Sequence, residues 1–258
     1  METLRERRIA VTRTEEDARS LVGMLRSKGA EVFVHPAIRR VPPRDPTALE
    51  EAVGRLRRGL YDGALFTSPA AVAALRRIWG DASLPVGILG AVGPATRAAL
   101  EAWTGGPVIV GPRHDGASLA EAMVGALGER LRGARFLQPR AEEGRTELRE
   151  GLEEAGARVE VVAAYRTEPE DAAALRGLRL RLERREVDAV VFASPSAVRA
   201  VAEACGGSLS RMGTIWGVAI GRTTAHALRE AGAPRVEVAL EATDEAIVEA
   251  LERRLADR

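Results

Sequence analysis

Polar residues suited to anion binding stand at the start of predicted helices, directly after apolar runs. Phe66-Thr67-Ser68-Pro69-Ala70-Ala71-Val72 has this arrangement, and Phe192-Ala193-Ser194-Pro195-Ser196-Ala197-Val198 repeats it 126 residues later. A serine at the N-cap and a proline at the next position are typical helix starts. The unpaired N–H groups of such a start bind carboxylates and phosphates. The two segments therefore predict two equivalent anion-binding loops.

A second pair of loops also places helix starts directly after apolar runs. Gly93-Pro94-Ala95-Thr96-Arg97-Ala98-Ala99-Leu100 returns as Gly221-Arg222-Thr223-Thr224-Ala225-His226-Ala227-Leu228, and Arg13 is matched by Arg140. Glycine before a helix lets a ligand approach the backbone closely. A Ser-Pro pair by itself often only begins a helix, but paired copies leave a structural and a ligand-binding role equally open. The repeats predict two homologous units facing each other with a ligand between them.

The residues of other common active sites are missing. His35, His114 and His226 lack metal-ligand spacing, and Cys205 has no second thiol beside it, so we expect no metal. We interpret His226 as a helix-face residue and Cys205 as a small core residue. The chain also lacks the glycine-rich nucleotide-binding motifs and the nucleophile-elbow motif, so we expect no cofactor. An active site without a metal, a cofactor or a strong base would act by binding and orienting its ligand.

Short β-branched runs alternate with helical stretches, which is typical of parallel α/β sheets. We expect strands near 8–12, 31–34, 61–66, 86–91 and 107–110 in the first half, and near 134–138, 158–162, 188–193, 216–220 and 235–239 in the second. We expect helices near 15–28, 46–58, 69–79, 94–103, 117–131, 143–155, 170–185, 195–204, 222–231 and 243–255. Glycines 29, 156 and 232 follow three of these helices, as C-terminal caps require.

Two segments interrupt this alternation at equivalent points of the halves. Prolines cluster between Pro36 and Pro46, and Ala164-Tyr165-Arg166-Thr167-Glu168-Pro169 follows the matching strand of the second half. If both are linkers, the chain's two ends form one domain and its middle forms the other. The alternative is a division into sequential halves near Arg132-Gly133, and the residues alone do not choose between these arrangements.

Composition narrows the class of protein. The chain has 258 residues, is 46% hydrophobic and carries a formal charge of +1, which argues against nucleic acid as a partner. Its charged start lacks a signal-peptide core, and no run is long and apolar enough to span a membrane, so we expect a cytoplasmic protein. Asparagine is absent, Gln138 is the sole glutamine and Lys28 the sole lysine, a pattern that indicates a thermophile.

Taken together, these motifs resemble the uroporphyrinogen-III synthase family. The resemblance runs in order along nearly the whole chain. It is carried by Arg7-Arg8-Ile9-Ala10-Val11-Thr12-Arg13, the two Ser-Pro segments, Ala91-Val92-Gly93-Pro94-Ala95-Thr96, Ala164-Tyr165-Arg166-Thr167 and Ala219-Ile220-Gly221-Arg222-Thr223-Thr224-Ala225. Arg222 departs from the family pattern, which commonly has proline there, and adds a cation near the ligand.

The resemblance implies an α/β fold of two flavodoxin-like parallel-sheet domains related by internal duplication and joined by a two-stranded linker. It selects the crossed arrangement, with one domain of residues 1–35 plus 170–258, a second of 43–163, and linkers at 36–42 and 164–169. It also implies a monomer that makes transient contact with hydroxymethylbilane synthase.

The implied reaction belongs to haem, sirohaem and cobalamin biosynthesis. Hydroxymethylbilane, a linear tetrapyrrole with eight carboxylates, loses water and closes with inversion of ring D to give uroporphyrinogen III. The reaction requires one selected conformer and an acid for the leaving hydroxide. Tyr165 matches the family tyrosine placed near that hydroxyl, and tyrosines remain protonated at neutral pH. A purely structural role for Tyr165 in the linker stays open.

The predicted substrate-binding residues come from the repeated loops and the two matched arginines. They are Arg13, Thr67, Ser68, Gly93, Pro94, Ala95, Thr96, Arg140, Ser194, Ser196, Gly221, Arg222, Thr223 and Thr224. Two other functions fit the same residues. A non-catalytic bilobal binding or sensor module would bind its ligand without turnover. A sugar-phosphate enzyme would normally add a lysine, metal carboxylates or a P-loop, and none is evident.

Overall fold

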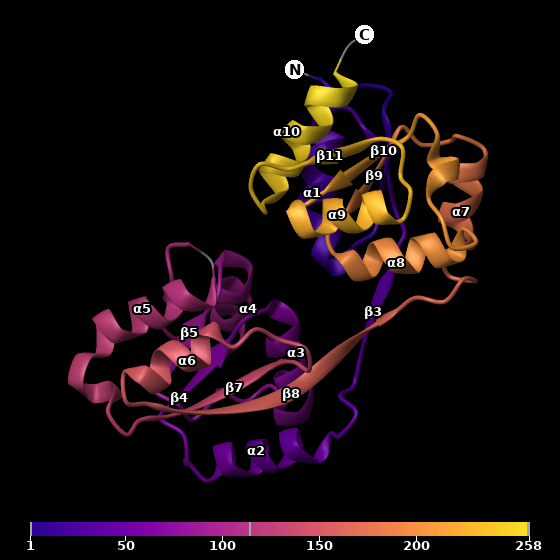
Figure 1. Cartoon of the computed structure of the whole chain (residues 1–258). Coiled ribbons are helices and arrows are strands. Elements are labelled where there is room, and N and C mark those ends of the chain that lie inside the picture. The colour runs from indigo at the N-terminus through magenta and orange to yellow at the C-terminus, as the bar shows by residue number, and fades with distance from the viewer. Residues whose placement is uncertain (1, 114, 257–258) are drawn as a thin grey trace. The chain divides into compact units, whose positions relative to one another are not determined.

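The computed structural model describes residues 2–113 and 115–256, which form two compact units (Figure 1). Unit 1 comprises the chain up to Arg39 together with the part from Glu168 onward, and unit 2 comprises Arg40–Thr167. No helix of the described ranges is long and apolar enough to cross a membrane.

Unit 1 contains a parallel five-stranded sheet covered by helices. Its strands, in spatial order, are β2 (Glu31–Val34), β1 (Arg8–Val11), β9 (Ala189–Phe192), β10 (Trp216–Ala219) and β11 (Val236–Val238). One face packs against α1 (Glu15–Ser27) and α10 (Asp244–Leu255). The other packs against α7 (Arg176–Glu183), α8 (Pro195–Ala204), the short 3-10 helix Ser210–Met212 and α9 (Arg222–Glu230). Val11 stands opposite Val191, so the first strand pairs with the C-terminal part of the chain.

Unit 2 contains a six-stranded sheet. The spatial order is β3 (Ile38–Val41), β8 (Arg158–Pro169), β7 (Arg135–Ala141), β4 (Gly63–Phe66), β5 (Ile88–Ala91) and β6 (Ile109–Val110), and the strands from β8 to β6 are parallel. One face packs against α2 (Thr47–Arg57), α3 (Pro69–Trp79) and α4 (Pro94–Thr104). The other packs against α5 (Gly116–Leu127), the 3-10 helix Gly128–Leu131 and α6 (Glu147–Glu154), and α5 and α6 lie side by side (Figure 1).

The two sheets share one strand order when β7 is counted as the first strand of unit 2. The order β8-β7-β4-β5-β6 then matches β2-β1-β9-β10-β11. Each unit also has an aspartate just before its central strand, β9 or β4, that forms two hydrogen bonds with the backbone of the neighbouring strand. We call this pair of bonds the aspartate clamp. Asp188 accepts from the backbone N–H of Arg8 and donates its own N–H to the Arg8 carbonyl, and Asp62 makes the same two bonds with Arg135. Equivalent residues in each unit therefore hold equivalent strands together.

Most predicted elements are present, and the helix-ending glycines adopt positive φ as expected, with Gly29 at 88° and Gly156 at 90°. The strand predicted at 158–162 was too short, because β8 continues to Pro169. The predicted linker segment 36–42 contains β3, which lies beside β8 in the sheet.

Two helix starts were also predicted too early. The helix predicted from 143 begins at Glu147, because residues 142–143 form a turn first, and a Cβ added at Gly144 would lie 2.8 Å from the Arg140 side chain. The helix predicted from 170 begins at Arg176, because Asp171 accepts from the Ala174 N–H and closes a separate turn first.

Candidate functional site

The Ser-Pro loop of unit 2 brings Ser68 and Tyr165 together. Ser68 caps α3 by accepting from the Ala71 N–H at 3.2 Å, and Pro69 occupies the first helical turn, as predicted. Its hydroxyl oxygen lies 3.0 Å from the Tyr165 hydroxyl oxygen. Tyr165 comes from β8, and the Arg40 guanidinium lies 6.0 Å from its ring centroid. The tyrosine hydroxyl therefore lies at the start of a helix, in a hydrogen bond with the capping serine.

The Ser-Pro loop of unit 1 has the same capping geometry without a tyrosine. Ser194 caps α8 by accepting from the Ala197 N–H at 3.2 Å, with Pro195 in the first turn, as predicted. Its hydroxyl oxygen lies 2.9 Å from that of Ser196. Both loops follow strands of the parallel sheets, so their helices present N–H groups at the edge where those strands end. We call this edge the carboxyl edge of each unit.

The two glycine loops begin helices at the same edges. Gly93 precedes α4 with a φ of 79°, a conformation that favours glycine, and Gly221 precedes α9 in extended conformation. Pro94, Ala95, Arg222 and Thr223 are exposed. Thr96 and Thr224 are buried at 2% and 3% exposure, so their side chains face the core. Ligand contact through these two threonines would therefore come from the backbone.

The matched arginines have different surroundings. In unit 1 the Arg13 guanidinium lies 2.5 Å from the carboxylate of Asp244, the first residue of α10, and is neutralised there. In unit 2 Arg140 donates to the Arg145 carbonyl oxygen at 2.5 Å. Burial, and secondarily the nearby Arg149, lowers the pKa of Arg140. Of the two, Arg140 is the cation without a carboxylate partner in the described part of the chain.

Each carboxyl edge also has a cavity. In unit 1 a space of about 470 Å³ is lined by Gly221, Arg222 and the 80% exposed Leu240. In unit 2 a space of about 390 Å³ is lined by Thr67, Val92, Gly116 and Arg145. The sequence analysis missed Leu240, Gly116 and Arg145, because they lie in loops or first turns outside the repeated motifs.

His35, His226 and Cys205 are the described histidines and cysteine, and they lie apart from one another along the fold. The described residues contain no group of three or more histidine, cysteine or acidic side chains that could hold a metal ion. His226 lies exposed on α9 beside Glu230, as predicted. His35 is half-buried, and burial lowers its pKa. His114 lies outside the described residues.

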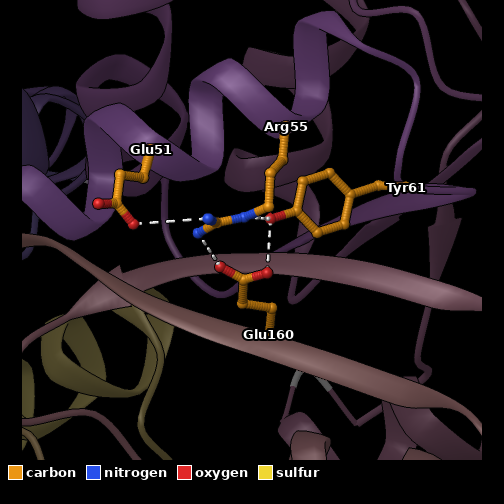
Figure 2. Close-up of polar contacts among 4 residues, drawn as sticks. All are labelled: Glu51, Arg55, Tyr61 and Glu160. Carbon is orange, nitrogen blue, oxygen red and sulfur yellow. Dashed lines mark hydrogen bonds and ion pairs between the residues drawn. The ribbon is translucent and has the colours of Figure 1, made fainter.

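A polar cluster missed by the sequence analysis lies at the opposite edge of the unit 2 sheet (Figure 2). The Tyr61 hydroxyl donates to Glu160 at 2.7 Å and accepts from Arg55 at 3.2 Å. Arg55 also contacts Glu160 at 2.5 Å and Glu51 at 3.5 Å. Burial raises the pKa of Tyr61 to about 12, with Glu160 adding to the effect and Arg55 opposing it. The cluster ties α2 to β8 and lies away from the predicted site.

A pH titration of the phenols tests this assignment, because the chain has only two tyrosines, Tyr61 and Tyr165. We expect the folded protein to show a tyrosinate absorbance step near pH 12. Tyr61→Phe should remove this step, whereas Tyr165→Phe should retain it. Circular dichroism at each pH checks that the fold is intact. A step near pH 12 that persists in Tyr61→Phe and disappears in Tyr165→Phe would contradict the assignment, because the step would then belong to Tyr165.

Within each unit the helix starts offer donors for carboxylates, and in unit 2 one of these starts has a tyrosine hydroxyl beside it. Backbone N–H groups at the starts of α3, α4, α8 and α9 supply anion donors at the carboxyl edges. The phenol of Tyr165 lies beside the start of α3 and can act there as a proton donor.

Comparison with known proteins identifies relatives of the same fold. A protein-family model described as uroporphyrinogen-III synthase HemD matches residues 19–249. The chain is 17% identical to uroporphyrinogen-III synthetase from Helicobacter pylori 26695, with a TM-score of 0.59 over 94% of this chain and 97% of that one. It is 21% identical to a mutant uroporphyrinogen III synthase from the extremely thermophilic bacterium Thermus thermophilus, with a TM-score of 0.51 over 96% and 98%. A search of curated protein sequences finds no match.

Proposed function

The chain belongs to the uroporphyrinogen-III synthase family, and on this basis we propose how its residues serve the reaction. The family consists of cofactor-independent cyclising lyases of tetrapyrrole biosynthesis. The chain accordingly dehydrates and cyclises hydroxymethylbilane, with inversion of ring D, to give uroporphyrinogen III. The family match over residues 19–249 is the observation that carries this function.

We propose that substrate carboxylates bind the helix starts at the carboxyl edges of both units. The groups concerned lie around Ser68, Gly93–Thr96, Ser194–Ser196 and Gly221–Thr224. Backbone N–H groups supply most of the donors, so the binding survives loss of any one hydroxyl. Arg140 and Arg222 would add positive charge, whereas Arg13 would have to leave Asp244 to do so.

Tyr165 is proposed as the acid for the leaving hydroxide. Its hydroxyl is hydrogen-bonded to Ser68, which holds it at the start of α3. Proton transfer from the phenol to the departing oxygen would release water and leave an azafulvenium cation at that end of the chain. Return of the pyrrole N–H proton to the phenolate would then give the neutral, electrophilic azafulvene. Bound carboxylates would hold the bilane in the conformer that closes with inversion.

The finer architecture is a proposal on the same basis. We propose that the two units arose by duplication and that 36–42 and 164–169 connect domains of residues 1–35 plus 170–258 and 43–163. The shared strand order and the paired Asp62 and Asp188 clamps support it. The protein would act as a cytoplasmic monomer. Transient contact with hydroxymethylbilane synthase would shorten the exposure of an unstable substrate to water.

Isomer analysis tests the function directly. Hydroxymethylbilane, freshly generated and added to the protein, should give the type III isomer, whereas the uncatalysed reaction gives type I. A binding or sensor module would leave type I as the product. Type I product at the uncatalysed rate, from protein whose circular dichroism shows it folded, would contradict the proposed function.

A further inference from the structure

One position differs between the units in a way that opens a space in unit 2. Asp115 and Thr243 are equivalent N-caps, of α5 and α10. The next residue is Gly116 in unit 2 and Asp244 in unit 1. Asp244 gives unit 1 its ion pair with Arg13, but Gly116 offers Arg140 no carboxylate. The cavity of about 390 Å³ is lined by Gly116. At this position unit 2 therefore has no carboxylate to pair with Arg140, whereas in unit 1 Asp244 pairs with Arg13.

A buried amide on the same sheet face also lacks a partner. Gln138 on β7 is fully buried at 0% exposure, and neither its amide nitrogen nor its amide oxygen hydrogen-bonds to any described residue. Burying such a group without a partner is unfavourable. The equivalent residue of unit 1, two positions before Arg13, is Val11, which is buried in an apolar cluster. The fold therefore accepts an apolar residue at this position, so packing does not require the amide.

The alternation of side chains along β7 places Gln138 on the sheet face that α5 and α6 cover. Phe136, two residues before Gln138, packs under α5 and α6, and side chains on a strand alternate between faces. Gln138 and Arg140 therefore share that face. Gly63 pairs with Phe136 and Ala64 with Leu137. Extending this register along both chains would bring Leu65 beside Gln138 and Thr67 beside Arg140. Thr67 lines the cavity, and on this extended register Gln138 stands on the same face, two residues deeper in the sheet than Arg140.

We propose that this cavity is a subsite for one carboxylate of the bilane, bound where Asp244 stands in the other unit. Arg140 and the N–H groups at the start of α5 would neutralise the carboxylate, and the Gln138 amide would donate to it from below. The inference rests on the proposed function and adds Gln138 and Gly116 to its binding residues.

The acidic residues that line the cavity do not take the place of the proposed ligand carboxylate. The Asp115 carboxylate accepts from the Ser118 N–H at 2.6 Å and lies 3.6 Å from Arg113. The Ser118 hydrogen bond lowers the pKa of Asp115, so this carboxylate is held as the helix cap. Glu147 also lines the cavity, but its side chain is on the exposed first turn of α6.

Nuclear magnetic resonance provides a test that does not depend on turnover. The chain has no asparagine and a single glutamine, so Gln138 gives the only side-chain carboxamide NH₂ pair in a ¹H–¹⁵N spectrum. Anaerobic uroporphyrinogen III should shift this pair. Acetate and inorganic phosphate, added separately, show whether a free anion suffices. Backbone signals that shift while the NH₂ pair stays unmoved would overturn the subsite, because the ligand would then bind elsewhere.

Substitutions at Gly116 and Gln138 provide the kinetic test. Gly116→Asp restores the carboxylate of unit 1 and should raise the KM for hydroxymethylbilane roughly 10-fold or more with little change in kcat. Gly116→Ala is the matched control, because both substitutions add a Cβ that would lie 3.2 Å from Leu148, and only Gly116→Asp adds the carboxylate. Gln138→Val copies Val11 and should raise KM roughly 10-fold while preserving the fold.

The outcomes separate this inference from the proposed function. Wild-type protein that makes no type III isomer contradicts the function itself. Wild-type protein that makes type III, with equal KM values in Gly116→Asp and Gly116→Ala and an unchanged KM in Gln138→Val, overturns the subsite alone. A shift of the Gln138 signal that Gly116→Asp abolishes and Gly116→Ala retains supports it.

Discussion

Tyr165→Phe should lower the turnover of hydroxymethylbilane by ~10²–10⁴-fold, the usual range for general acid assistance. The substitution removes one hydroxyl, which lies 3.0 Å from the Ser68 hydroxyl on a half-buried side chain, so the fold should survive. Assays quenched at set times after addition of freshly generated hydroxymethylbilane give kcat for the variant and the wild type. Thermal unfolding compares the stability of the two proteins. Activity should not vanish, because the helix starts still select the conformer and the substrate already tends to ionise.

The product isomer separates two roles of Tyr165. Slow formation of pure type III would mean that the phenol acts in loss of the leaving group. A mixture with type I would mean that it mainly orients the chain. Ser68→Ala serves as the matched control, because it removes the hydrogen-bond partner and leaves the phenol, and we expect a much smaller loss. If Tyr165→Phe equals the wild type in rate and isomer purity, the residue is a structural anchor.

Gly63→Ala should destabilise the protein near the upper end of the range of about 1–3 kcal/mol typical of overpacked cores. A Cβ added at Gly63 would lie 2.6 Å from the Ile88 carbonyl oxygen and 2.6 Å from the Phe136 ring. Both neighbours belong to the centre of the unit 2 sheet, and the backbone oxygen has little freedom to move. Urea denaturation followed by circular dichroism measures the loss.

The equivalent position in unit 1 indicates that the Phe136 ring is what leaves no room for a Cβ at Gly63. Ala189 takes the place of Gly63 in β9 and pairs with Ile9, where unit 2 has Phe136. Phe136→Ile should therefore recover part of the stability lost in Gly63→Ala, and a double-mutant cycle measures the coupling. Equal losses from Gly63→Ala in the two backgrounds would show that the Ile88 oxygen, and not the ring, causes the destabilisation.

Features that depend on neighbouring residues could be predicted from the sequence alone. Ser68 and Ser194 were predicted as N-caps and are N-caps, because capping is decided within a few residues of the helix start. The alternation of strands and helices was predicted for the same reason. The C-terminal end of β8 and the starts of α6 and α7 were not, because they depend on pairing with β7 and β3, on the turn at 142–143 and on the turn closed by Asp171.

The contacts between distant side chains became visible only in the folded units. Arg13 and Arg140 look equivalent in sequence, yet Arg13 is neutralised by Asp244, 231 residues away, and Arg140 is not. Tyr165 and Ser68 are 97 residues apart and come together because β8 extends beyond its predicted end. The sequence shows Gln138 only as the sole glutamine, and only the folded sheet shows that its amide is buried without a partner among the described residues. Local patterns cannot show such contacts, because they form between strands and helices that only the folded sheets bring side by side.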